Sequence, residues 1–133
     1  MATLTLDDAM RITEAAREKA VELGTPVTIT VVDDGGRVRA QGRMDGARFG
    51  TLSVSSNKAY TAAAFGAPTG FLGDLVQPGA PLFGFAQAAG GRIVTFAGGV
   101  PLLRDEQVVG AIGISGGSVD QDQAIAAAGA AVL

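Results

Sequence analysis

Apolar and polar positions alternate along this chain with periods that predict helices at its two ends and strands between them. Residues 6–23 place apolar side chains at three- and four-residue steps, which is the spacing of one buried helix face. Thr5 and Asp8 form a capping box before this stretch, and Gly24 followed by Pro26 ends it. The first element is therefore predicted to be an amphipathic helix whose charged residues face solvent.

A hairpin is predicted directly after this helix. Residues 27–32 are all β-branched, and the Asp-Asp-Gly-Gly sequence at 33–36 is a turn signal. In residues 37–44 small or apolar side chains alternate with arginine and glutamine, as expected of a strand with one face in water or against a polar partner. A loop is expected at residues 45–50.

The second half of the chain supplies the remaining predicted elements. Helices are expected at residues 51–65 and 69–76, an irregular segment at 77–92, and strands at 93–96, 100–103 and 107–115. Ser118 and Gln121 form a second capping box, and Asp120 and Asp122 lie in the first turn of the helix that follows. Because hairpins dominate this order, residues 1–133 are predicted to form a single α+β domain with a five-stranded, mainly antiparallel sheet flanked by helices.

The glycines of residues 110–117 resemble two motifs whose chemistry the rest of the sequence does not support. Gly113-Ile-Ser115-Gly-Gly117 matches the nucleophile elbow of serine hydrolases in form. The chain contains no histidine, however, so a Ser-His-acid triad cannot be assembled. The same glycines do not follow the dinucleotide-binding pattern. We interpret this stretch as a buried strand, a tight turn and the start of a helix.

Composition narrows the possible functions. The chain has no cysteine, no histidine, only two lysines and a net charge of −3, which argues against disulfides, thiolate chemistry and binding to nucleic acid or an anionic membrane. Its Asp and Glu residues are scattered, so no metal site is predicted. No apolar run approaches the ~18 residues of a membrane-spanning helix. The first residues resemble no export signal, so a cytoplasmic protein is expected.

The low charge density predicts a homo-oligomer. Charged residues make up 17% of the chain, below the ~25% of a typical soluble domain, whereas 47% of its residues are hydrophobic. Such a surface is expected to be partly covered by further copies of the chain.

One apolar stripe of the helix predicted at 51–65 includes a lysine. Val54, Lys58, Thr61 and Phe65 recur there at four-, three- and four-residue steps. A lysine in such a stripe either snorkels at a subunit contact or meets a ligand at a pocket wall. The pattern leaves both interpretations open.

Five co-linear motifs resemble the GlcG/HbpS family. They are RMDGA at 43–47, KAYTA at 58–62, GGR at 90–92, GGVP at 98–101 and GAIGISG at 110–116. The resemblance covers nearly the whole chain and implies a profilin-like fold with a five-stranded antiparallel sheet, and assembly into symmetric oligomers. The carboxy-terminal domain of PduO-type proteins is similar.

For function, the family resemblance implies haem binding, haem degradation or a place in glycolate or diol metabolism. Where members ligate iron through histidine, this chain has none, and it has no cysteine. The side chains left as possible axial ligands are those of Tyr60, Met44 and Lys58.

Three functions therefore stay open. The first is binding of haem, another tetrapyrrole or a small organic acid, with basic side chains neutralising carboxylates or propionates. The ligand-binding residues predicted for it are Arg43, Met44, Asp45, Arg48, Val54, Lys58, Tyr60 and Thr61. The second is a cofactor-free enzyme acting on a carbonyl or hydroxy-acid metabolite, with Lys58 as the reactive amine and Asp45 as the acid or base. The third is an oligomer without a ligand, in which Val54 and Phe65 form an interface.

Overall fold

A four-stranded antiparallel sheet in the order β2–β1–β4–β3 lies at the centre of the computed structural model, which describes residues 3–133. The strands are β1 (Thr28–Asp33), β2 (Val38–Arg43), β3 (Gly99–Arg104) and β4 (Gln107–Ser115). The two central strands, β1 and β4, are buried along most of their length. Strand β2 lies at one edge and exposes alternate side chains, as its pattern predicts.

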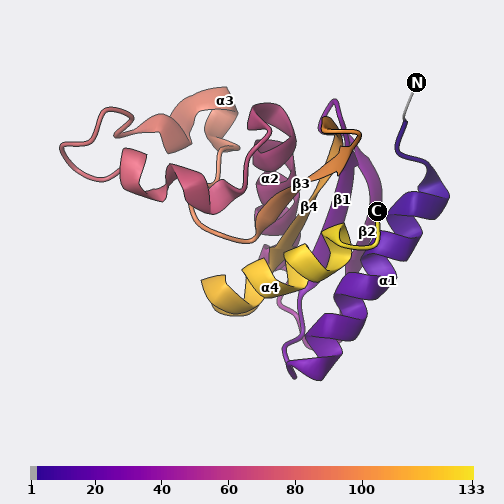
Figure 1. The fold of residues 1–133 in the computed structure, drawn as a ribbon. Coiled ribbons are helices and arrows are strands. Elements are labelled where there is room, and N and C mark those ends of the chain that lie inside the picture. The colour runs from indigo at the N-terminus through magenta and orange to yellow at the C-terminus, as the bar shows by residue number, and fades with distance from the viewer. Residues whose placement is uncertain (1–2) are drawn as a thin grey trace.

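Helices cover both faces of the sheet (Figure 1). Helices α1 (Leu6–Glu22) and α4 (Val119–Ala130) pack on one face, where their apolar residues meet Ile29, Val31, Ile112 and Ile114. Helix α2 (Gly50–Phe65) packs on the other face through Ala59 and Ala62. Both predicted capping boxes are formed, at Thr5 with Asp8 and at Ser118 with Gln121.

Helix α2 approaches the sheet closely because the contact residues are small and polar. The hydroxyl of Ser55 donates to the carbonyl oxygen of Gly113 at 2.7 Å, and it lies 2.8 Å from the hydroxyl of Thr30. A Cβ atom at position 113 would collide with the carbonyl oxygen of Ser55. Glycine at 113 is therefore needed for the approach, and not for a turn.

Residues 66–92, here called the lobe, project to one side of the molecule beyond α2 (Figure 1). The lobe consists of 3₁₀ turns at Thr69–Leu75 and Phe85–Gln87, the single-turn helix α3 (Ala88–Gly91) and irregular connections. Gly66, with φ of +65°, ends α2 in the left-handed conformation that glycine favours.

The fifth strand, predicted at 93–96, is not formed, so the prediction of five strands is not confirmed. Residues 93–95 are irregular and residues 96–98 form a bend. Their backbone groups bond to threonine side chains instead of a neighbouring strand: the amide of Val94 donates to Thr61 at 3.0 Å, and the carbonyl of Phe96 accepts from Thr69 at 2.7 Å. Within residues 3–133, no helix has both the length and the apolar character that crossing a bilayer requires.

Candidate functional site

Lys58 occupies the buried space between α2, β4 and α4. Its side chain is 1% exposed, and its ammonium donates to the carbonyl oxygen of Ile114 at 2.8 Å and to Oδ2 of Asp122 at 3.1 Å. The same nitrogen lies 5.1 Å from the ring centroid of Phe96, within the range of a cation–π contact. Lysine at 58 is thus surrounded by partners from its own chain.

The burial of Lys58 has an electrostatic cost that its partners offset only in part. Desolvation lowers the pKa of the ammonium below its ordinary value, while the charge and hydrogen bond of Asp122 act in the opposite direction. A lowered pKa is what a reactive lysine needs, but an amine also needs access to a carbonyl carbon. Lys58 meets the first condition and, at 1% exposure, lacks the second.

Asp122 is the residue of this cluster that the sequence does not single out. Its Oδ1 accepts from the amide of Gly117 at 2.8 Å while its Oδ2 accepts from Lys58, so it joins the turn before α4 to α2. The sequence suggests a favourable charge in the first turn of a helix and a match to the GlcG/HbpS family at Gln121-Asp122, and it assigns Asp122 no role in a site. A sharper signal is present, because Asp122 shares the helix face of Ile125, Ala126 and Gly129, which are all buried. A carboxylate on a buried helix face needs a cationic partner. Lys58 is the lysine that the sequence places within an apolar stripe of a helix.

The predicted residues 43–48 lie at the end of β2 and in the loop before α2, exposed apart from Met44 and Ala47. Arg43 donates to the carbonyl oxygen of Ala47 at 3.2 Å, within its own loop. The side chain of Met44 packs against the core on the α1 side of the sheet. Among the described residues, no ion pair joins Asp45 to Lys58, whose carboxylate partner is Asp122.

Tyr60 and Thr61 lie near the other end of α2 and face different surroundings. The guanidinium carbon of Arg92 lies 3.6 Å from the ring centroid of Tyr60, so the arginine stacks on the ring. Thr61 is buried and lines a cavity. Val54, seven residues before Thr61, is half-buried about 10 Å away along the helix axis.

The cavity lined by Thr61, here called the lobe cavity, lies between α2 and the lobe and measures about 280 Å³. Phe65, Phe71, Leu75 and Phe85 supply apolar parts of its wall. The rings of Phe65 and Phe85 lie 5.5 Å apart at an angle of 56°, a tilted aromatic pair that joins the helix to the lobe.

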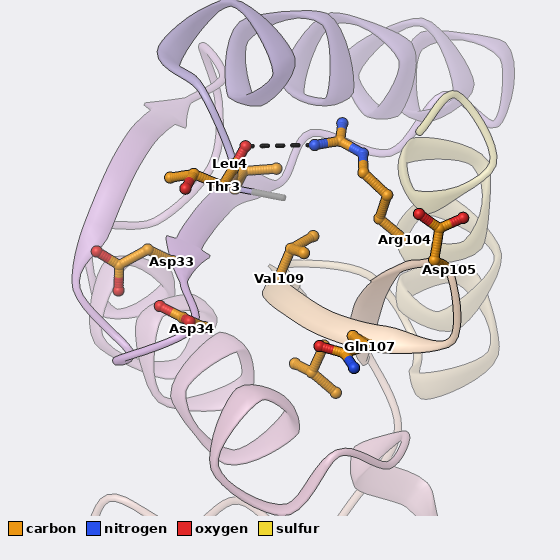
Figure 2. A pocket seen from close by; sticks show the side chains of 9 residues that line it. Thr3, Leu4, Asp33, Asp34, Arg104, Asp105, Gln107 and Val109 are labelled. Carbon is orange, nitrogen blue, oxygen red and sulfur yellow. Dashed lines mark hydrogen bonds between the residues drawn. The ribbon is translucent and has the colours of Figure 1, made fainter. Parts of the chain in front are cut away.

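A second cavity of about 620 Å³ lies at the hairpin ends of the sheet (Figure 2). Arg104 closes one side by donating to the carbonyl oxygen of Thr3 at 3.2 Å, and Asp33 and Asp34 lie on the opposite side. Its floor includes Val109. Burial disfavours ionisation of Asp33, but the backbone amides of residues 37 and 35 bond to the carboxylate and leave its pKa lowered. Of the eight predicted ligand-binding residues, only Thr61 lines either of these two cavities.

The sequence of this chain matches a known protein family. The model of the family described as haem degrading protein HbpS-like matches residues 4–131. The chain belongs to the HbpS-like family. This confirms the resemblance predicted from its five motifs, and the α+β fold with an antiparallel sheet flanked by helices agrees with it.

Two relatives match more than nine-tenths of this chain. An uncharacterized 15.0 kDa protein from the dhaT-dhaS intergenic region of Citrobacter freundii is 43% identical over 126 residues, which are 95% of this chain and 89% of that protein. The corrinoid adenosyltransferase PduO of Salmonella typhimurium is 42% identical over 123 residues. That alignment covers 92% of this chain and 37% of PduO, so the chain matches one part of a longer enzyme.

A solved structure extends the comparison to a bound ligand. The crystal structure of a PduOC:heme complex superposes with a TM-score of 0.95 and 40% identity, over 99% of this chain and 96% of that one. That relative therefore binds haem on nearly the same backbone.

Proposed function

We propose that this HbpS-like chain is a small-molecule-binding protein whose ligand is held in the lobe cavity. The observation that carries the proposal is a cavity of about 280 Å³ between α2 and the lobe, with phenylalanine and leucine side chains in its wall. Ligand pockets of proteins are concave, mostly apolar and from about 300 Å³ upward, so this cavity lies just below the usual range and suits a small ligand. The haem-bound relative supports a binding role for the fold.

The residues present do not fit a haem held through its iron. Lys58 already donates to Asp122 and Ile114, and Met44 packs into the core. The ring of Tyr60 is covered by Arg92. None of the three lines the lobe cavity, and the chain has neither histidine nor cysteine to replace them. A tetrapyrrole, if offered, would have to be held by apolar contact alone.

A small organic acid is supported less well than an apolar ligand. Arg43 and Arg48, the arginines predicted to neutralise a carboxylate, lie at the end of β2 and the loop after it, and neither lines the lobe cavity. Surface arginines without a surrounding pocket offer little selectivity, because water competes for the same hydrogen bonds.

The alternative enzyme function relies on Lys58 and Asp45, and the position of Lys58 weighs against it. Its amine is enclosed by Asp122, Ile114 and Phe96, so a carbonyl substrate has no approach to the nitrogen. Borohydride treatment with pyruvate or glyoxylate is expected to leave Lys58 unmodified in intact protein mass spectra. Trapping at Lys58, lost in Lys58→Met, would restore the enzyme proposal.

The test of the binding proposal compares two tryptophan variants, since the natural chain has no tryptophan. Leu75→Trp fills the lobe cavity, whereas Leu103→Trp adds the same ring on the exposed side of β3. Native mass spectrometry of protein purified under mild conditions is expected to show a small-molecule adduct in wild type and in Leu103→Trp, and none in Leu75→Trp. An adduct equally abundant in all three would place the ligand elsewhere.

A hemin titration tests whether a side chain of this protein ligates haem iron. We expect no Soret shift typical of axial ligation in wild type or in Tyr60→Phe. A shifted Soret band that disappears in Tyr60→Phe would show ligation through Tyr60 and overturn the apolar binding mode.

Assembly into a homo-oligomer is the remaining part of the proposal. Phe83 of the lobe and Phe96 beside it are exposed, at 67% and 48%, which suits a surface covered by another copy. Light scattering coupled to gel filtration is expected to give a mass of at least two chains. Because Lys58 lies inside the subunit, it does not contribute to such an interface, and the third function, a ligand-free oligomer, is favoured only if no ligand is found.

A further inference from the structure

The wall of the lobe cavity contains no charge. Of the ten residues that line it, eight are apolar and two are threonines. A ligand group that enters must therefore leave water without meeting a side chain of opposite charge. Burial of an unpaired charge is strongly unfavourable, and burial of an unpaired dipole less so.

The two threonine hydroxyls are not free to receive a ligand. Thr61 donates to the carbonyl oxygen of Asn57 at 2.8 Å and accepts from the amide of Val94 at 3.0 Å. Thr69 donates to the carbonyl of Phe96 at 2.7 Å and accepts from the amide of Gly99 at 3.0 Å. Each hydroxyl has one proton, and both protons are used by the backbone. The cavity thus offers no side-chain donor to a carboxylate or a phosphate.

Aromatic side chains occupy both sides of the cavity. Phe65 from α2 and Phe85 from the lobe form the tilted pair, and Phe71 contributes a third ring from the first 3₁₀ turn. Phenylalanine rings prefer tilted or offset contact with other aromatic rings, which favours a flat ligand over a branched aliphatic one. The exposed fractions of Phe65 and Phe71, 50% and 65%, place these two rings at the mouth.

The volume limits the size of the ligand. An apolar cavity of ~150 Å³ is large enough for benzene. About 280 Å³ therefore has room for roughly two fused rings.

Building on the proposed function, we infer that the lobe cavity selects uncharged aromatic molecules of about this size and rejects anions of the same shape. This assigns a ligand class to the site. It separates the chain from a haem protein that depends on iron ligation and from a receptor for small organic acids.

The experiment compares two probes that share one ring system. Naphthalene and 2-naphthoate are each equilibrated with the full chain at pH 7 by dialysis, and the bound and free probe are measured after extraction. Naphthalene is expected to bind, and 2-naphthoate at least about 100-fold more weakly, because its carboxylate would be buried without a partner. Leu75→Trp and Leu82→Trp, each filling the cavity from a different position, are expected to abolish naphthalene binding, whereas Leu103→Trp keeps it.

A specificity change provides an independent check. Leu82 lies at the cavity and is 37% exposed, so Leu82→Arg places a guanidinium at the mouth without burying it. This variant is expected to bind 2-naphthoate at least about 10-fold more tightly than wild type, since a long arginine side chain can reach from the mouth into the cavity and give the buried carboxylate the charged partner that the wild-type wall lacks.

The outcomes distinguish failure of the proposed selectivity from failure of the proposed binding site. Tight binding of 2-naphthoate that Leu75→Trp abolishes would overturn the selectivity and leave the lobe cavity as a binding site. If neither probe bound to wild type and Leu75→Trp still removed the purification adduct, the selectivity would also be overturned and the lobe cavity would remain a binding site. Failure of both probes and persistence of the adduct in Leu75→Trp would overturn the site itself.

Discussion

The ammonium of Lys58 and the carboxylate of Asp122 meet at 3.1 Å in the interior, with exposed side-chain fractions of 1% and 4%. The pair spans 64 positions of sequence and joins α2, on one face of the sheet, to α4, on the other face. The contact passes the end of β4, where the carbonyl oxygen of Ile114 accepts a second bond from the same nitrogen. Lys58 therefore connects the two helix layers.

Removing one member of this pair is expected to cost more than removing both. Lys58→Met leaves the Asp122 carboxylate buried with the amide of Gly117 as its remaining partner, and the expected loss in free energy of unfolding is about 3–5 kcal/mol. Asp122→Asn keeps that amide bond but leaves the ammonium without its counter-charge. The double variant Lys58→Met/Asp122→Asn is expected to be more stable than the sum of the single losses predicts. Urea unfolding of all four proteins gives the coupling energy.

The exposed pair of Arg17 and Glu14 is the matched control, because its side chains are each 51% exposed. Arg17→Met is expected to change the free energy of unfolding by less than about 1 kcal/mol. If Lys58→Met proved equally mild, Lys58 would not connect the layers.

Helices α1 and α4 and the hairpin of β1 and β2 could be predicted from the sequence because local rules determine their boundaries. The capping boxes at Thr5 and Ser118 mark the starts of α1 and α4, and both helices begin at the next residue. The partner of Lys58 could not be found in that way. Ion pairing between α2 and α4 depends on how two helices cross the sheet, and helical periodicity shows only which side of each helix is buried.

Gly113→Ala is expected to unfold the protein or to lower its melting temperature sharply. The added methyl group would overlap the carbonyl oxygen of Ser55 and the backbone of Ala59, both of which lie where α2 contacts the sheet directly. Gly42→Ala, in β2, is the control, since nothing lies within 4 Å of its added Cβ. Thermal melts followed by circular dichroism compare the two. Equal melting temperatures would mean that α2 can move away from β4 at little cost.

Acid is expected to weaken the contact of α1 with β3. The amide of Thr5, Arg104 and Arg11 all donate to the carboxylate of Asp8 and hold its pKa well below the ordinary value, against the effect of burial. A carboxyl with a lowered pKa in the folded state stabilises the fold fully above its unfolded pKa of ~3.9, and that contribution is lost as the pH falls below this value.

Asp8→Asn tests this contribution directly. The variant is expected to be less stable than wild type at pH 7, and the difference should shrink as urea unfolding is repeated from about pH 4 downward. Asn at position 8 still accepts hydrogen bonds, so the change reports on charge. A difference that stays constant with pH would exclude a role for ionised Asp8.

The lobe illustrates where prediction from sequence ends. Its irregular character follows from glycine and proline, but the segment at 93–96, directly after the lobe, has the composition of a strand without becoming one. The amide of Val94 and the carbonyl of Phe96 are taken by the hydroxyls of Thr61 and Thr69, and a β-ladder would need those same groups. Side-chain hydroxyls from distant helices leave no mark in the local pattern, so neither the missing strand nor the cavity beside it was predictable.

Thr61→Val is expected to loosen this segment while leaving the sheet intact. Valine has nearly the shape of threonine but lacks the hydroxyl that accepts from Val94, so a half-buried amide loses its partner at a cost of about 1–3 kcal/mol. Amide hydrogen exchange is therefore expected to speed up at Val94 and not at Ile112 in β4. Thr61→Ser keeps the hydroxyl and is expected to retain slow exchange at Val94. Equal exchange at Val94 in both variants would show that packing beside α2, and not this hydroxyl, holds the segment in place.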